Sequence, residues 1–223
     1  MKFLIRTVLL FAFFASLASC KQSTGEKAIV GEAKEVVAKA MTGTSYGVDL
    51  GSSMVTWAGS KLTGTHTGTI NLSSGNILSE NGKITGGEFV MDMGSLTNTD
   101  MAAGQGKEKL EGHLKNADFF DVPQFPTAKF VITKVTALEG DADATHLVYG
   151  NLTMKDVTKE VGFKAKVSQS GGMINVSTPK FAINRTDWGI KYGSSSFADI
   201  AKDKAINNDI DLEITLSAKA QES

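Results

Sequence analysis

Apolar and polar residues alternate through most of this chain with the two-residue period that is typical of a half-buried β-strand. The alternation is clearest in segment 208–219. Its apolar positions are Ile210, Leu212, Ile214, Leu216 and Ala218, and its polar positions are Asp209, Asp211, Glu213, Thr215, Ser217 and Lys219. Similar patterns predict strands over 45–50, 54–62, 65–74, 83–93, 128–138, 145–154, 157–168 and 173–184. Successive strands with one buried face and one solvated face indicate an antiparallel sheet.

Glycine, asparagine and proline mark where these strands turn or break. Asn81-Gly82 is a strong hairpin signal, because both residues tolerate a positive φ. Gly86-Gly87 predicts a bulge or a sharp bend, and Pro179 predicts an edge or a break within 173–184. A strongly twisted sheet of about eight strands tends to close on itself. We therefore expect an all-β fold, an extended antiparallel β-barrel that has no open edges and can hold a small ligand. A two-sheet sandwich with a solid core is the alternative, and alternation alone does not separate the two.

One stretch, residues 107–130, departs from the strand pattern. Leu110 and Leu114 lie at helical spacing and predict a short helix that ends near Asp118. Phe119, Phe120, Phe125 and Phe130 then follow within twelve residues, together with Pro123 and Pro126. Both prolines exclude a helix and favour extended backbone before them. We expect one helix between strands 4 and 5 of the barrel, followed by an aromatic corner at the mouth of an apolar cavity.

The first nineteen residues are typical of a signal peptide that is removed from the mature protein. Lys2 and Arg6 surround the start of an apolar region, and the run 8–17 is too short to predict a membrane span. Leu17-Ala18-Ser19-Cys20 is similar to a bacterial lipobox, in which the cysteine becomes lipidated; an ordinary signal peptide with an incidental cysteine is the alternative. We expect residues 1–19 to be the signal peptide.

The remaining chain divides into a spacer and a domain. Residues 20–44 contain lipidated Cys20 and a segment that is low in aromatic residues, which indicates a flexible tether of roughly 25–30 Å. Residues 45–220 are expected to form the barrel. Acidic residues that direct some lipoproteins to the cell surface are missing after the cysteine, where the chain reads Lys21-Gln22-Ser23, and this favours the periplasmic side.

Composition excludes several classes of function. Cys20 is the only cysteine, so the folded part has no disulfide, zinc–cysteine cluster or thiol nucleophile. Outside the signal peptide 21 basic and 24 acidic residues are scattered along the chain, which predicts no nucleic-acid partner. His66, His113 and His146 have no metal-ligand spacing, so no metal site is predicted. We expect His113 to be a capping or surface residue.

Several short motifs together resemble the YceI-like, polyisoprenoid-binding family. They are Tyr46-Gly-Val-Asp, Ser53-Met-Val-Thr-Trp57, His66-Thr-Gly68, Gly87-Glu-Phe-Val-Met-Asp92, His113-Leu, Asp118-Phe-Phe-Asp121, Phe125-Pro126, Phe130 and Asn184-Arg-Thr-Asp-Trp-Gly-Ile190. They occur in the family's order over about residues 45–220. One departure is the helix region AAGQGKEKLEGHL, where many members of the family have an Arg-Asp pair, so a role for that pair is not transferred.

The resemblance implies a lipocalin-like barrel whose tunnel holds a long amphiphile such as an isoprenoid chain. Members of the family are mostly secreted or periplasmic, and many are not enzymes. We therefore expect a lipid-anchored protein of the bacterial cell envelope that stores, transports or senses an isoprenoid lipid or quinone. The resemblance implies no catalytic residue, no metal and no cofactor other than the bound lipid, and it leaves a homodimer open.

The candidate ligand-binding residues are mainly aromatic. They are Trp57, His66, Phe89, Phe119, Phe120, Phe125, Phe130, Phe163, Phe181, Arg185 and Trp188. Each aromatic residue could equally be ordinary core. Arg185 could meet a polar head group or hold the strand end at its turn, in a pair with Asp187. Two other functions stay open: an envelope module whose barrel is filled by its own side chains, and a hydrolase or isomerase that uses His66 with a nearby Asp or Ser.

Overall fold

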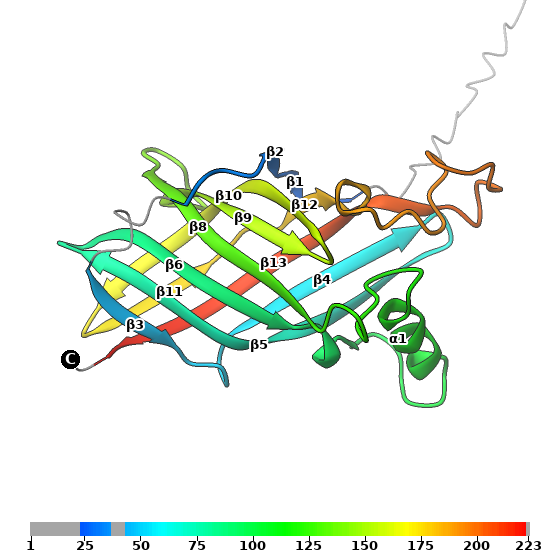
Figure 1. The fold of residues 1–223 in the computed structure, drawn as a ribbon, viewed down its shortest axis with the longest axis horizontal. Coiled ribbons are helices and arrows are strands. Elements are labelled where there is room, and N and C mark those ends of the chain that lie inside the picture. Colours follow the sequence, from blue (N-terminus) through cyan, green and yellow to red (C-terminus); the bar gives the residue numbers. More distant parts are fainter. Residues whose placement is uncertain (1–22, 37–42, 222–223) are drawn as a thin grey trace, which may run out of the picture.

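The computed structural model describes residues 23–36 and 43–221, and Figure 1 shows a long, twisted β-barrel with one helix at its right-hand end. Within those residues a single hydrogen-bonded sheet contains 13 strands. The strands are β1 (Glu26–Lys27), β2 (Ile29–Glu32), β3 (Thr44–Val48), β4 (Met54–Lys61), β5 (Gly64–Glu80), β6 (Lys83–Asp92), β7 (Thr97–Asn98), β8 (Thr127–Ala137), β9 (His146–Met154), β10 (Val157–Ser170), β11 (Met173–Ser177), β12 (Phe181–Asn184) and β13 (Ile206–Ala220). The helical elements are α1 (Lys107–Lys115) and the 3₁₀ turns η2 (Met93–Ser95) and η3 (Arg185–Trp188).

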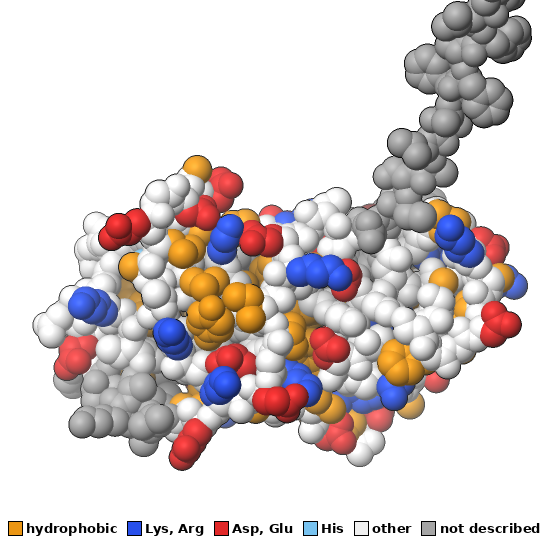
Figure 2. All heavy atoms as spheres, turned by 90° about the horizontal axis from the view of Figure 1, so that it is seen from above, with side chains coloured by type: hydrophobic (Ala, Val, Ile, Leu, Met, Phe, Trp, Pro, Cys, Tyr) orange, Lys and Arg blue, Asp and Glu red, His pale blue; other side chains and the backbone are white. Residues whose placement is uncertain are grey.

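The sheet closes on itself as a ring of eight strands. From β13, hydrogen-bonded neighbours run through β11, β10, β9, β8, β6 and β5, and both β3 and β4 connect β5 back to β13. The pairings around this ring are antiparallel. The predicted barrel is therefore confirmed, with its helix between β6 and β8, and the sandwich alternative is wrong. Figure 2 shows charged side chains of both signs scattered over one face of the barrel, as the sequence predicted.

Strand β5 is longer than the sequence indicated, because residues 75–80 continue its ladder with β6 and β3. Shifts of register between Leu72 and Ser74 and between Leu78 and Ser79 bend the long strand. Gly87 allows the two strands to approach at this bend, since a Cβ there would lie 2.7 Å from the carbonyl oxygen of Asn76. The predicted bulge and the hairpin at residues 81–82 are confirmed, the latter by positive φ values at both residues.

The segment predicted as one strand over 173–184 is two strands, β11 and β12. Pro179 lies in the gap and has no N–H to donate to a ladder. Thr178 supplies the connection to β13 instead: its N–H donates to the carbonyl of Ile214, and its hydroxyl accepts from the N–H of Ile214. The break lets β12 approach the strand β13 at a new position, with Phe181 opposite Leu212.

An N-terminal strap, defined here as residues 23–36, closes a seam in the barrel wall. Strand β12 pairs with β13 and β1, and the first half of β10 pairs with β9 and β2. The strap thus lies between β12 and β10, with β1 parallel to one and β2 antiparallel to the other. Ala28 and Val30 pack against the hydrophobic core. The prediction of a flexible tether is wrong for this part of 20–44, while Cys20 and the proposed signal peptide lie outside the described residues.

Buried Asp211 holds the start of the strap. Its carboxylate accepts hydrogen bonds from the Ser23 hydroxyl, the Thr24 N–H and hydroxyl, and the Gly25 N–H. Position 25 has room only for glycine, because a Cβ there would lie 2.7 Å from the backbone of Phe181. Burial raises the pKa of Asp211, but these hydrogen bonds outweigh it and leave the pKa below its ordinary value. The charged carboxylate therefore fixes the strap to β13.

Helix α1 is attached to the barrel through Glu111. Its carboxylate accepts hydrogen bonds of 2.7 Å from the hydroxyl of Thr97 and from the N–H of Asn98, both on β7. After the helix, the N–H groups of Phe119 and Asp121 both donate to the carbonyl of Asn116, which turns the chain back toward the barrel. Within the described ranges, no helix is long and apolar enough to cross a membrane.

Candidate ligand-binding site

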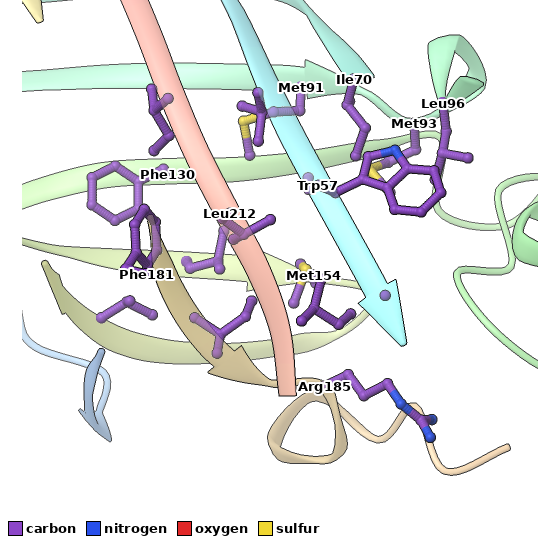
Figure 3. Close-up of a pocket in the computed structure, with 18 of the residues that line it drawn as sticks. Trp57, Ile70, Met91, Met93, Leu96, Phe130, Met154, Phe181, Arg185 and Leu212 are labelled. Atoms are coloured by element: carbon purple, nitrogen blue, oxygen red, sulfur yellow. The ribbon is translucent and has the colours of Figure 1, made fainter. Parts of the chain in front are cut away.

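The barrel encloses a cavity of about 490 Å³. Side chains from nine strands, β4 to β6 and β8 to β13, form its wall, and the end beside α1 carries the polar groups. Figure 3 shows Arg185 and Trp57 toward one side of the site and Phe130 and Phe181 farther along it. The volume lies within the range of about 300–1,000 Å³ that is usual for pockets that bind small molecules.

Nine of the eleven predicted residues line this cavity. They are Trp57, His66, Phe89, Phe119, Phe120, Phe130, Phe163, Phe181 and Arg185. Four of the phenylalanines form one row of rings across β6, β8, β10 and β12. Ring centroids are 6.4 Å apart between Phe89 and Phe130, 5.5 Å between Phe130 and Phe163, and 4.5 Å between Phe163 and Phe181, where the rings are stacked.

A glycine makes room for this row. A Cβ at Gly150 would lie 2.3 Å from the ring of Phe130, so a side chain on β9 would displace that ring. The stacked pair Phe163 and Phe181 lies behind the strap, since it joins β10 to β12 across the seam. The aromatic row therefore depends on strands that only the closed barrel brings together.

Phe125 and Trp188 do not line the cavity. Phe125 is half-buried in the corner after α1, where its N–H donates to the carbonyl of Asp121. Trp188 is fully buried, and its indole N–H donates to the carbonyl of Leu152 at 3.0 Å. Trp188 thus holds η3 against β9, because a buried indole needs an acceptor for its N–H.

Most of the wall is aliphatic and was not named from the sequence. These side chains include Ile70, Met91, Met93, Leu96, Met154 and Leu212 (Figure 3). Strand parity could have found many of them, since four of the five inward positions that the alternation marks in β13, all except Ala218, line the cavity. Met93 has the same signal, because the expected strand 83–93 places it on the face of Phe89 and Met91, whereas Leu96 lies beyond that segment and has none.

His113 and Tyr192 lie at the mouth of the cavity, on the side of α1. The ring of Tyr192 lies 4.7 Å from that of His113 and 5.4 Å from that of Phe119, measured between centroids. The prediction that His113 caps the helix or lies at the surface is incomplete. Its carbonyl and its Nδ1 both bond to Asn116, the C-cap residue of α1, but its half-buried ring also lines the cavity. Tyr192 gave no sequence signal, because the fold alone brings the segment after η3 to α1.

His66 faces the same mouth and is oriented by Asp100. Its Nδ1 lies 2.9 Å from the Asp100 carboxylate, which also accepts hydrogen bonds from the N–H of Thr67 and the amide of Asn98. Burial raises the pKa of Asp100, but these hydrogen bonds outweigh it and hold the pKa below its ordinary value. The carboxylate therefore stays charged and fixes the imidazole.

Arg185 is the most deeply buried charge at the mouth, with 1% of its surface exposed. Its guanidinium donates to the backbone carbonyls of Ile190, Ile206 and Asn207, at 2.7, 3.2 and 3.1 Å. The expected pair with Asp187 is replaced by these three bonds. Burial lowers the pKa of Arg185, although arginine remains protonated in proteins. Arg185 thus fixes the segment after η3 and also brings a positive charge to the cavity.

The charged side chains that line this mouth in the described structure are all basic. Lys61, Lys204 and Arg185 line the cavity, and no Asp or Glu in the described part of the chain does so. The indole N–H of Trp57 is buried without a hydrogen-bond partner among the residues described. A buried donor without a partner carries a free-energy cost. The lysines at the mouth, which are exposed, favour a ligand whose head group accepts hydrogen bonds.

Among the described residues, the two histidines that line the cavity have hydrogen-bond partners other than a nucleophile. His66 has Asp100 as its hydrogen-bond partner in the described structure, and no serine hydroxyl or thiol bonds to it. Ser194 is fully buried, and its hydroxyl accepts from the N–H of Ser196. His146 bonds to Thr145 and does not line the cavity. Among residues 23–36 and 43–221, no group of His, Cys, Asp and Glu has the geometry of a metal site.

The family comparison matches the model of the YceI-like domain over residues 46–218. Curated relatives called UPF0312 protein include one from Pseudomonas putida (strain F1), 40% identical over 87 residues, which cover 35% of this chain and 42% of the relative. Another, from Pseudomonas fluorescens (strain SBW25), is 33% identical over 114 residues, or 49% of this chain and 53% of the relative. The chain thus matches about half the length of these relatives, or less.

Two solved structures share the fold. The Burkholderia cenocepacia protein BcnA superimposes with a TM-score of 0.61 at 20% identity, over 77% of this chain and 99% of its own. A polyisoprenoid-binding domain from Saccharophagus degradans, implicated in plant cell wall breakdown, gives a TM-score of 0.60 at 19% identity, over 80% of this chain and 99% of its own. At this level of identity the likeness concerns the barrel itself.

Proposed function

Because this chain belongs to the YceI-like domain family, we propose that its barrel binds a long-chain amphiphile, such as an isoprenoid lipid or quinone, in the cell envelope. The observation that carries the proposal is the cavity: about 490 Å³ of space with an apolar wall and a mouth of donors at one end. The ligand class agrees with that named for the Saccharophagus degradans domain of the same fold.

The energetics favour binding without chemistry. Transfer of apolar surface from water is worth about 25 cal/mol per Å². An isoprenoid tail that buries several hundred Å² would gain on the order of 10 kcal/mol, before the cost of ordering the chain and losing its freedom of motion. Such a protein needs a dry cavity and an open mouth, and no catalytic group. We propose a binding protein that stores, carries or senses its ligand, and that is not an enzyme.

The mouth indicates the kind of head group. Lys61 and Lys204 are exposed and can donate hydrogen bonds to a head group, and buried Arg185 adds positive charge behind them. Carbonyl, carboxylate and phosphate oxygens accept such bonds. The tail would then lie along the row from Phe89 to Phe181 described above, with its head beside α1.

The proposed location follows from the sequence. Lys2, Arg6 and the apolar run 8–17 support a signal peptide, and Cys20 supports lipidation after its removal. We propose that the mature protein is lipid-anchored and faces the periplasm. Several acyl chains on one cysteine would give stable anchoring, because more than one chain is needed for it.

Native mass spectrometry of the detergent-solubilised protein tests the ligand class. The protein is stripped of lipid and exposed to an isoprenoid quinone with a long tail and, as the matched control, to a quinone with the same ring and no tail. We expect one long-tailed quinone per chain and little retention of the tailless one. A protein that is isolated empty and takes up neither compound contradicts the proposal.

The barrel filled by its own side chains is the competing function. It predicts no space for a hydrocarbon chain, and the cavity volume speaks against it. The hydrolase alternative has no nucleophile beside His66 in the described structure. The homodimer remains a prediction, which light scattering of the purified protein would test.

A further inference from the structure

Exposed apolar side chains gather at the mouth of the barrel. Six large apolar residues are exposed in the described structure: Ile29, Leu50, Met54, Leu62, Tyr192 and Phe197. Leu62, Tyr192 and Phe197 lie at the end that carries the mouth, and we call these three the rim. They expose 44%, 47% and 53% of their surface. The cavity opens to solvent at this same end.

Two loops bring the rim together. Lys61, next to Leu62, pairs with Ile206 across β4 and β13. The N–H of Ile206 in turn donates to the carbonyl of Gly193 at 2.8 Å, beside Tyr192. The turn between β4 and β5 and the loop 191–205 therefore lie next to each other, as Figure 1 shows at its right-hand end.

The two segments that carry these apolar groups are rich in lysine. The turn 61–64 carries Lys61, and the loop 191–205 carries three lysines and two aspartates, an excess of two positive charges in all. The Nζ of Lys191 lies 4.8 Å from the centroid of the Phe197 ring. Apolar side chains among lysines suit the interface of a bilayer that contains anionic lipids.

The N-terminal end of the strap, at Ser23, lies near this same rim. Ser23 is held by Asp211, and Asp211 lies opposite Ala58 on β4, three residues before Lys61. At about 3.4 Å per residue, that is about 10 Å along the strand. Cys20 precedes Ser23 by three residues, and three extended residues reach at most about 11 Å. An acyl chain on Cys20 would therefore enter the bilayer close to the part of the barrel that carries the rim.

We infer that the rim docks on the surface of a lipid bilayer and holds the mouth of the cavity against it. The inference rests on the proposed binding function and on lipidation of Cys20. A freely flexible tether of 25–30 Å would leave the barrel unoriented, whereas the docked strap leaves only Lys21 and Gln22 between the anchor and the first bound residue, Ser23. With the mouth on the membrane, an amphiphile passes between bilayer and cavity without exposing its tail to water, which the transfer free energy disfavours.

Site-specific fluorescence on the lipidated protein tests the orientation. Once Cys20 is acylated, a second cysteine is the only free thiol. The exposed residues Ser195, beside the rim, and Ser170, at the turn before β11, are replaced one at a time (Ser195→Cys, Ser170→Cys) and labelled with an environment-sensitive dye. Residue 170 lies at the opposite end, because Met173 of the same turn pairs with Lys219 near the end of β13. Each protein is reconstituted into vesicles of phosphatidylcholine and phosphatidylglycerol in equal parts, with and without brominated lipid.

We expect the dye at residue 195 to shift to the blue and to lose most of its emission in brominated vesicles, while the dye at residue 170 keeps its emission. The double variant Leu62→Ser with Phe197→Ser should abolish quenching at residue 195. Equal quenching at both positions, quenching only at residue 170, or none at either overturns the inference. So does mature protein whose Cys20 carries no acyl chain by mass spectrometry.

The same double variant separates docking from binding. Leu62 and Phe197 do not line the cavity, so uptake of the long-tailed quinone in detergent should be unchanged. Loss of quenching with retained uptake supports the docked rim. Uptake without quenching in the unsubstituted protein overturns docking and leaves the binding function intact, whereas quenching without uptake contradicts the binding function and, with it, the role given to docking.

Discussion

Replacement of Asp211 by asparagine should release the N-terminal strap from the barrel. Asparagine has nearly the same shape, but one of its two terminal atoms is an NH₂ donor that would face the N–H and hydroxyl donors of residues 23–25. The native carboxylate accepts four hydrogen bonds and is 8% exposed. Hydrogen bonds to a charged group contribute about 1.5–3 kcal/mol each, against about 0.5–1.5 kcal/mol for neutral ones.

The cost of opening the strap should therefore fall by about 3 kcal/mol, if about two of the four bonds are lost and the others weaken. Since 1.4 kcal/mol is a factor of ten, the open population should rise roughly a hundredfold. The N–H groups of Glu26 and Ala28 report this directly, because they donate to the carbonyls of Lys180, just before β12, and of Ala182 in β12. Their hydrogen exchange should accelerate by about the same factor, while amides of β9 keep their protection.

Asp209→Asn is the matched control. Asp209 forms an ion pair of 3.2 Å with Lys27, whose side chain is 78% exposed. Such a surface pair contributes about 0.5 kcal/mol, so exchange should change by about a factor of two. The reasoning would be refuted if Asp211→Asn changed exchange of the strap no more than this control, or if amides of β9 accelerated equally, which would mean global unfolding.

Acid should have the same effect as the substitution. The pKa of Asp211 is lower when the strap is bound than its ordinary value of about 3.9. The stabilisation by its charge is therefore complete above about pH 4 and is lost as the pH falls through the lowered pKa. Protection of the strap amides, corrected for intrinsic exchange, should decline in this acid range in the native protein and stay flat in Asp211→Asn.

Three further outcomes are expected. Val148→Trp fills the cavity from β9 and should abolish uptake of the long-tailed quinone, whereas Leu147→Trp, at the next position outside the cavity, should retain it by native mass spectrometry. Arg185→Met removes the donor of three buried carbonyls and should lower the free energy of unfolding by about 3 kcal/mol in urea denaturation; an unchanged midpoint would contradict its structural role. Glu111→Gln should loosen α1, which faster hydrogen exchange of the helix amides would show. Hydrogen bonds from β7 lower the pKa of Glu111, so the native protein should show the same loosening as the pH falls through that pKa.

The two-residue period determined the barrel strands, because burial of one face fixes which positions are apolar. That is why the bounds of β4, β6, β8 and β9 agree with the expected segments to within one residue. The helix and the aromatic corner could also be predicted from the sequence, because proline and helical spacing act on the backbone within a few residues. The candidate aromatics lay on inward positions for the same reason, and most of them line the cavity.

Only the tertiary structure decided which partners the polar and aromatic side chains at the mouth contact. Arg185 meets three carbonyls, two of them about twenty residues away in the chain, and Tyr192 reaches His113 across the mouth. The strap was predicted as a flexible tether because its composition is polar and its own strands are too short to be stable alone. Its order comes from a seam between β12 and β10 and from the carboxylate of Asp211, nearly 190 residues later. Local sequence encodes the face that a side chain occupies, whereas partners that the closure of the barrel brings together have no signature in either segment.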